Sequence, residues 1–409
     1  MLPKLLLFSL LISISFSLSA QKANKAYAIT GQSAGNFNWT DIREIDLSTG
    51  KVSNTIFESG KTAFSLAKTS KGKNVVLGVH DANSLPMQSM VAAVAYDKRH
   101  DKLFFTPMKI GELRWLDLSN KSEAKFYTLQ DQLLNKGNLN DEANQITRMV
   151  ISADGNGYAI TNDGNHLIRF TTGKNIVITD LGNLIDASSN NGVSIHNKCS
   201  SWGGDMIADV QGNLYLFSSS QSVFTINVES RVATYLGHIK NLTPTFTVNG
   251  AAVDNDDNII ISSANTFEGF YKLNIKDLAA SKITTVGQVF NASDLANSNL
   301  LFQNQLRNEV GVADLIERDV LGNDLVSIYP NPVISNQFKV TFDNTRAGKY
   351  DIALTDLEGR LIMTRQVNIR FPNQVETVQM KVKPAGGMYL IKVTGTNKKL
   401  VFSDKLIVD

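Results

Sequence analysis

One short pattern recurs four times in the chain and restricts the possible folds more than any other feature. Each copy has an apolar strand, a tight turn that begins with an aspartate, and a second apolar strand. Aspartate favours such a turn because its short side chain can accept a hydrogen bond from the backbone two residues further on. The turn aspartates are Asp97, Asp154, Asp209 and Asp254.

The spacing of these turns indicates a repeat of four strands. The turn aspartates lie 57, 55 and 45 residues apart. A propeller blade usually takes ~40–50 residues, so the longer intervals imply inserted loops. Third strands are expected at 113–116, 167–170, 223–226 and 270–275, and fourth strands at 125–129, 176–181, 233–238 and 282–286. Four antiparallel strands repeated in tandem are typical of a β-propeller, and an open pair of β-sandwiches is the alternative.

The two ends of the repeat region complete each other. Residues 25–30 resemble the second strand of a blade that lacks a first strand, and residues 292–302 resemble a first strand that lacks a third. We therefore expect 292–302 to supply the innermost strand of the first blade, which removes an exposed sheet edge. Residues 61–89 are unassigned and could hold a further blade. The prediction is an all-β chain with a five- or six-bladed β-propeller over 21–305.

Charge and composition exclude several classes of partner and site. The chain has 40 Lys and Arg against 38 Asp and Glu, a net charge of +2, which argues against nucleic acid or an anionic membrane as the main partner. The single cysteine, Cys199, excludes a disulfide framework and a multi-cysteine metal site. His196, three residues away, makes only a weak pattern for zinc or a thiol nucleophile. Residues 254–258 lack the glycine and glutamate of a helix–loop–helix calcium site, so we expect neither metal nor cofactor.

The predicted fold, rather than any motif, indicates where a ligand would bind. A propeller binds at the mouth of its central channel, on the face made by loops that lead into first strands and loops that join second and third strands. Those loops include 32–39 and 186–204, and the second is long, polar and contains Trp202. The alternative is that Trp202 packs on the neighbouring blade. The candidate ligand-binding residues are Arg148, His166, Trp202, Asp205 and Asn249.

Catalysis is not expected, although it stays open. The sequence has no Gly-x-Ser-x-Gly elbow and no phosphate-binding loop between a strand and a helix. A glycosidase or lyase would need two converging carboxylates, or a carboxylate with a basic partner such as Arg148 beside Asp205. We predict a non-enzymatic module that binds a glycan, peptide or protein. The alternatives are a polysaccharide- or peptide-degrading hydrolase or lyase at the channel mouth, and a structural or adhesion component.

The first twenty residues have the pattern of a secretory signal peptide. Lys4 precedes a short apolar run, and small residues lead up to Gln21. Cleavage after Ser19 fits the small-x-small pattern, but we place it after Ala20, so that the predicted signal covers 1–20. The alternative is a membrane anchor, which the many serines disfavour. No later stretch has the ~18 consecutive apolar residues that a membrane-spanning helix needs.

The chain changes pattern at about Val326. Short alternating runs separated by turn residues predict six or seven strands in residues 326–409, which is typical of a small immunoglobulin-like β-sandwich. Strands are expected at 337–342, 350–355, 361–367, 376–382, 388–393 and 400–408. Residues 306–325 are charged, have no strand pattern and are the expected linker.

This C-terminal segment resembles a known family in four ordered motifs. They contain Tyr329, Pro330, Asn331 and Pro332, then Gly359, then Gly387 and Tyr389, and finally Lys405. Together they are similar to the type A C-terminal sorting domain of Bacteroidetes cargo of the type IX (Por) secretion system. An ordinary immunoglobulin-like ligand-binding module is the alternative.

The resemblance implies a route for the chain. The Sec machinery would take it to the periplasm, and the type IX outer-membrane translocon would recognise the C-terminal domain. A sortase-like peptidase would remove that domain, within 306–325. The remainder would be secreted or joined to surface lipopolysaccharide.

Overall fold

The computed structural model describes residues 24–33, 35–70, 73–76, 85–285, 287–304, 326–333, 335–342, 345, 347–356, 360–370, 374–395 and 400–408. The predicted signal peptide, the predicted linker and the motif residue Gly359 lie outside these residues. Within them, no helix is long and apolar enough to cross a membrane.

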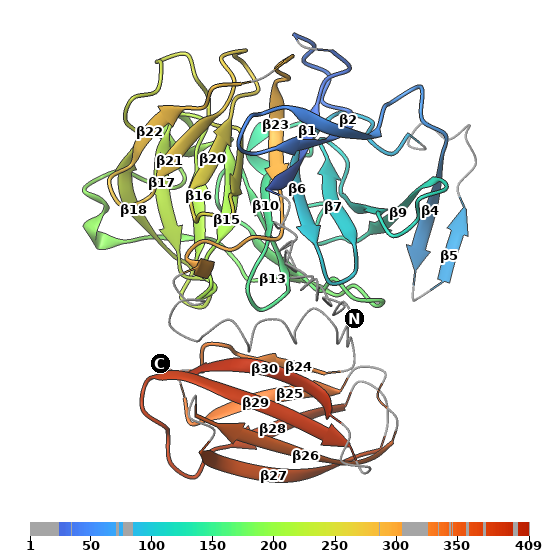
Figure 1. Cartoon of the computed structure of the whole chain (residues 1–409), viewed down its shortest axis with the longest axis vertical. Coiled ribbons are helices and arrows are strands. Elements are labelled where there is room, and N and C mark those ends of the chain that lie inside the picture. Colours follow the sequence, from blue (N-terminus) through green and yellow to red (C-terminus); the bar gives the residue numbers. More distant parts are fainter. Residues whose placement is uncertain are drawn as a thin grey trace, which may run out of the picture.

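Five sheets form the first part of the chain (Figure 1). The first blade, from inside to outside, has β23 (Ala292–Ala296), β1 (Lys25–Thr30), β2 (Asp41–Asp46) and β3 (Val52–Phe57). The second has β6 (Val91–Asp97), β7 (Lys102–Pro107), β8 (Glu112–Asp117), β9 (Ala124–Gln130), β4 (Phe64–Ser70) and β5 (Lys73–Val76). The third has β10 (Ile146–Ile151), β11 (Gly157–Thr161), β12 (Leu167–Phe170) and β13 (Ile178–Asp180).

The last two blades follow the same plan. The fourth has β15 (Asp205–Ala208), β16 (Leu214–Phe217), β17 (Ser222–Ile226), β18 (Val232–His238) and the short β14 (Ile185–Asp186). The fifth has β19 (Gly250–Val253), β20 (Ile259–Ser262), β21 (Tyr271–Asn274) and β22 (Ala279–Lys282). Short helices lie in the loops of the described propeller, among them η1 (Glu142–Asn144), η2 (Ser188–Asn190) and α1 (Lys198–Ser201).

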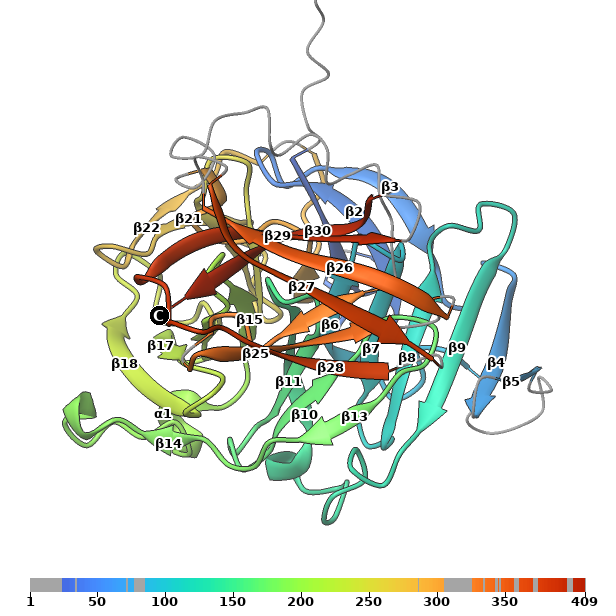
Figure 2. The same ribbon diagram turned by 90° about the horizontal axis from the view of Figure 1, so that it is seen from below.

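The five sheets close into a ring, as the view from below also shows (Figure 2). The innermost strands contact one another in the order β23, β6, β10, β15 and β19, and β19 returns to β23. The fold is therefore a five-bladed β-propeller, and the predicted all-β fold class is confirmed.

The predicted closure of the ring is confirmed by the pairing of its two ends. β23 pairs antiparallel with β1, with Tyr27 opposite Ala296 and Ile29 opposite Asp294. β1 then pairs with β2. The C-terminal end of the repeat region therefore supplies the inner strand of the N-terminal blade.

The sequence left open whether residues 61–89 hold a further blade; their described residues belong to the second blade instead. β4 pairs in parallel with β9, the fourth strand of the second blade, and β5 pairs antiparallel with β4. The segment thus widens the second blade to six strands. One correction concerns the fourth strand of the last blade, which is Ala279–Lys282 instead of 282–286, because a short turn after Asn274 brings Ala279 directly opposite it.

The aspartate-led turns form as their sequence predicts. In each, a carboxylate oxygen accepts a hydrogen bond from the backbone N–H two residues further on. The pairs are Asp97 with Arg99 at 3.0 Å, Asp154 with Asn156 at 2.9 Å, Asp209 with Gln211 at 2.9 Å, and Asp254 with Asp256 at 2.8 Å. Turn chemistry thus accounts for the acidic run at 254–258.

Apolar clusters between neighbouring blades hold the ring together. Phe104 of the second blade packs on Phe170 of the third, with ring centroids 5.3 Å apart, and both side chains are buried. Similar clusters join the first blade to the second, the third to the fourth, the fourth to the fifth, and the fifth to the first. Burial of apolar area at these five junctions favours a closed ring.

The C-terminal part is the predicted β-sandwich. One sheet has β24 (Ser327–Tyr329), β25 (Gln337–Phe342) and β28 (Gln374–Gln379). The other has, in order, β27 (Leu361–Ile369), β26 (Gly348–Thr355), β29 (Gly387–Gly395) and β30 (Leu400–Val408). A single apolar core fills the space between the sheets.

Candidate binding face of the propeller

The predicted site residues lie on or beside the loops of the channel mouth, and each has partners within the protein. Arg148 on β10 is fully buried. Its guanidinium donates to the carbonyl oxygens of Gly203 at 2.9 Å, Ser201 at 2.6 Å and Thr161 at 2.9 Å, with a longer bond to Asn162. Burial lowers the pKa of Arg148 to about 9. The side chain joins the 186–204 loop to the end of β11.

Two other predicted residues, His166 and Asn249, also fix loops. The His166 ring lies 2.8 Å from the Asp180 carboxylate. The Asn249 side-chain oxygen accepts from the backbone N–H of Ala264 at 3.0 Å. These side chains are half-buried, and their contacts hold neighbouring loops in place.

The 186–204 loop is stabilised from within. The Trp202 indole N–H donates to the His196 carbonyl at 3.0 Å, and the Lys198 ammonium lies 5.2 Å from the centre of the Trp202 ring. His196 itself contacts the carbonyls of Asp163 and Leu184. Trp202 is half-buried, while Cys199 is exposed. In the described part of the chain, no group of three or more His, Cys, Asp and Glu side chains could hold a metal ion.

Asp205 takes part in a carboxyl pair that the sequence did not reveal. Asp205 on β15 accepts from the backbone N–H of Ala251 on β19 at 2.5 Å and of Leu295 on β23 at 3.4 Å. Its carboxyl group faces that of Asp294 on β23, and both residues are completely buried. The structure thus brings Asp205 to Asp294, and no ion pair joins it to Arg148 within the described residues.

The surroundings of this pair favour protonation. No well-formed hydrogen bond reaches either carboxyl oxygen of Asp294. Burial, and then the charge of Asp205, raise the pKa of Asp294 well above its ordinary value. Burial also raises the pKa of Asp205 to about 8, against hydrogen bonds from the backbone. Two facing, buried carboxyl groups without a cation beside them favour a state in which at least one of them is protonated.

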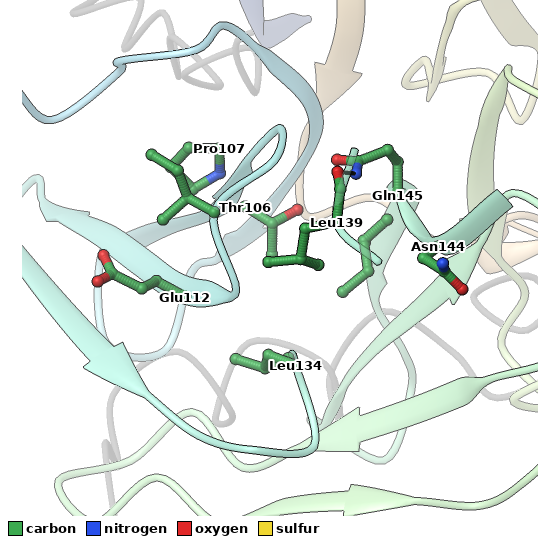
Figure 3. A pocket seen from close by; sticks show the side chains of 9 residues that line it. Thr106, Pro107, Glu112, Leu134, Leu139, Asn144 and Gln145 are labelled. Atoms are coloured by element: carbon green, nitrogen blue, oxygen red, sulfur yellow. Dashed lines mark hydrogen bonds between the residues drawn. The ribbon is translucent and has the colours of Figure 1, made fainter. Parts of the chain in front are cut away.

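A narrow polar pocket lies between the second and third blades (Figure 3). Its volume is about 10 Å³ and its lining includes Thr106, Glu112 and Gln145. That is space for about one water molecule. The buried Thr106 hydroxyl has no hydrogen-bond partner among the described residues. Burial opposes ionisation of Glu112, but hydrogen bonds from Gln130, Thr128 and Arg114 outweigh it and lower the pKa of this carboxyl group. The pocket is too small for an organic ligand.

A larger hollow opens on the rim of the channel mouth. It has a volume of about 470 Å³ and is lined by Gly35, Phe267, Gln288 and Val289. Phe37 stands beside it, with its ring centroid 6.1 Å from that of Phe267 and the two planes tilted by 56°. Both phenylalanines are about half exposed, at 48% and 49%.

Three loops from two adjacent blades build this aromatic hollow. Phe37 lies between β1 and β2, Phe267 between β20 and β21, and Gln288 in the segment that leads into β23. All three loops are of the two kinds that form the mouth face, and loop 32–39 is one of those proposed from the sequence. The sequence analysis missed Phe267 and Gln288. The loop 263–270 contains two phenylalanines, Phe267 and Phe270, and the sequence alone does not tell which one is exposed.

The hollow carries no charge in its lining. The nearest acidic side chain along the chain, Glu268, is held by the Thr243 hydroxyl at 2.7 Å and by the Tyr271 hydroxyl at 2.8 Å. The buried guanidinium of Arg43 stacks on Phe290 at 4.3 Å and pairs with Asp41 at 3.3 Å. The surface therefore suits an uncharged ligand with an apolar face.

The C-terminal sandwich matches a known family. The model of the secretion system C-terminal sorting domain, Por_Secre_tail, matches residues 327–409. No curated protein matches the chain.

Three solved structures are similar over most of the chain. PorZ, a surface component of the type IX secretion system of Porphyromonas gingivalis, is 15% identical with a TM-score of 0.32; the match covers 94% of this chain and 51% of PorZ, so the chain spans about half of its length. Virginiamycin B lyase from Staphylococcus aureus is 11% identical with a TM-score of 0.33, covering 95% and 96% of the two chains. A putative 6-phosphogluconolactonase from Bacteroides uniformis is 11% identical with a TM-score of 0.35, covering 87% and 99%. At these TM-scores the likenesses do not bear on function.

Proposed function

The sorting domain marks this chain as cargo of the type IX secretion system, exported to the cell surface or the medium, and we propose that its propeller binds a glycan there without catalysing a reaction. The aromatic hollow at Phe37 and Phe267 is the observation that carries this proposal. Exposed apolar patches on a soluble surface mark sites of interaction. Aromatic rings present flat apolar faces on which the C–H face of a sugar ring can stack.

The geometry favours a glycan over other ligands. The lining is uncharged, and the exposed amide of Gln288 beside Phe267 offers both a donor and an acceptor for sugar hydroxyl groups.

Burial of the carboxyl pair supports binding over hydrolysis. A glycoside hydrolase needs two carboxyl groups that reach the substrate. Asp205 and Asp294 are 0% exposed, and Arg148 donates its hydrogen bonds to backbone carbonyls. The perturbed carboxyl groups of the channel are therefore out of reach of a bound polymer.

The finer steps of export belong to the same proposal. A signal peptide at 1–20 would direct the chain to the Sec machinery. A sortase-like peptidase would cut within 306–325 after the translocon has recognised the sandwich. The released propeller would then be secreted or joined to surface lipopolysaccharide.

A glycan array probed with residues 21–325 tests the proposal, followed by product analysis of every glycan that binds. We expect binding without turnover. The double variant Phe37→Ala/Phe267→Ala should lose that binding, while Val177→Ala, an exposed apolar side chain beside β13, should keep it. Turnover of a bound polymer would favour the hydrolase or lyase alternative, and binding only to peptides would overturn the ligand class.

A further inference from the structure

On the free side of β30, the C-terminal strand of the sorting domain, the side chain of Asn331 makes the backbone hydrogen bonds that a neighbouring strand would otherwise make. β30 is an edge strand that pairs with β29 on one side. On β30 the Asn331 carboxamide donates from Nδ2 to the Lys405 carbonyl at 2.7 Å and accepts at Oδ1 from the Ile407 N–H at 2.7 Å. Two residues later, the Val333 N–H donates to the Ile407 carbonyl at 2.7 Å.

The residue types around Asn331 explain why a side chain has this position. A carboxamide offers a donor and an acceptor in one plane, as a peptide group does. Pro330 and Pro332 have no N–H, so the backbone beside Asn331 cannot supply the donor that Lys405 receives. The same prolines prevent this segment from extending the ladder to another strand, which protects the edge of β30 from pairing with other chains.

These bonds also fix the register of the last residues. Leu406 and Val408 are completely buried in the sandwich core, while Lys405 and Ile407 are partly exposed. A slip by one residue would exchange the buried and exposed sets. Asn331 binds the two backbone groups that flank Leu406 and therefore opposes such a slip.

We propose that Asn331 is a positioning residue for type IX sorting: its carboxamide holds β30 in register so that the side chains of Lys405 and Ile407 are presented to the secretion machinery on the outer face of a folded strand. The proposal rests on the sorting domain and not on the ligand of the propeller. It assigns a role to one motif residue, with Lys405 and Ile407 as the positions it controls.

The test follows export of the full-length chain in a bacterium that has type IX machinery, and measures hydrogen exchange on the same chain purified from a host without that machinery, where the sorting domain is kept. In Asn331→Ala the Ile407 amide should exchange about tenfold faster or more, because its acceptor is gone, and export should fall in parallel. Asn331→Asp keeps the acceptor but loses the donor to Lys405, so export should fall while Ile407 keeps part of its protection.

Two controls separate positioning from stability. Asn368→Ala changes an exposed asparagine on β27, at the opposite edge of the same sheet, and should leave export unchanged. Val378→Ala removes two methyl groups from the core that the two sheets share and lowers the stability of the sandwich while leaving every hydrogen bond of β30 to Asn331 in place.

The comparison with the core variant decides the question. The proposal is supported if Val378→Ala is still exported and Asn331→Ala is not, although the sandwich of Asn331→Ala is as stable as that of Val378→Ala or more stable. Equal export loss in both variants at equal stability would overturn it, as would wild-type export of Asn331→Ala or an unchanged exchange rate at Ile407.

Discussion

Asp205 and Asp294 face each other from two inner strands of the propeller, both completely buried, and Asp294 lies on the strand that closes the ring. Asp205 also binds the backbone of β19 and β23. The pair therefore joins the fourth, fifth and first blades at the point where the chain completes the ring. The protonation state of the pair should therefore affect the free energy of unfolding of the closed propeller.

The first prediction concerns the pH dependence of unfolding. The pKa of Asp205 is raised to about 8 and that of Asp294 is raised well above its ordinary value, so the folded pair binds more protons than the unfolded chain between pH ~4 and ~8. This contribution to stability is fully present below pH ~4, falls as pH rises, and is lost once the pH passes the folded pKa values.

Asp294→Asn should make this dependence shallower, because one titrating group is removed while an amide N–H still faces Asp205. Urea unfolding at several pH values from 5 to 8 measures the slope, which changes by at most about 1.4 kcal/mol per pH unit for each proton. Asp256→Asn, an exposed turn residue, is the control. An unchanged slope in Asp294→Asn would contradict protonation of the buried pair in this pH range.

Arg148→Lys should destabilise the propeller by about 3 kcal/mol, because lysine cannot reproduce a planar fork that donates to Gly203, Ser201 and Thr161 together. Denaturant unfolding measures the loss. Arg231→Lys, at a half-buried position with one long bond to Asn183, should change stability by less than about 0.5 kcal/mol. A similar small effect at Arg148 would argue against its structural role.

Gly157→Ala should destabilise the third blade by about 2 kcal/mol. A Cβ atom at Gly157 would lie 2.0 Å from the ring of Phe170, which is completely buried and packed on Phe104. Thermal unfolding measures the shift. Gly173→Ala, where the closest neighbour of a Cβ is 4.0 Å away, is the matched control, and equal effects at both positions would disprove the steric explanation.

Local sequence patterns were sufficient to predict the blades. The aspartate turns depend on residues two positions apart, and Asp97, Asp154, Asp209 and Asp254 all form the predicted bond. The closure by residues 292–296 also followed from the pattern, because each end lacked the strand that the other end supplies. Residues 61–89 were not assignable, because the parallel pairing of β4 with β9 leaves no hairpin signal between them.

The candidate site depended on contacts that the sequence does not encode locally. Phe37 and Phe267 are far apart in the chain and meet only because the ring brings the first and fifth blades together. Asp205 and Asp294 meet for the same reason. A polar residue such as Asn249 in a mouth loop has the same sequence pattern whether it binds a ligand or, as its bond to Ala264 shows, another loop.

The most direct test of the account is the affinity of residues 21–325 for the glycan found on the array, measured by calorimetry for wild type, Phe267→Ala and Val177→Ala. Loss of one stacking face should weaken binding by about tenfold, or 1.4 kcal/mol, in Phe267→Ala and leave Val177→Ala unchanged. Equal affinities for all three proteins would contradict a binding site at the aromatic hollow.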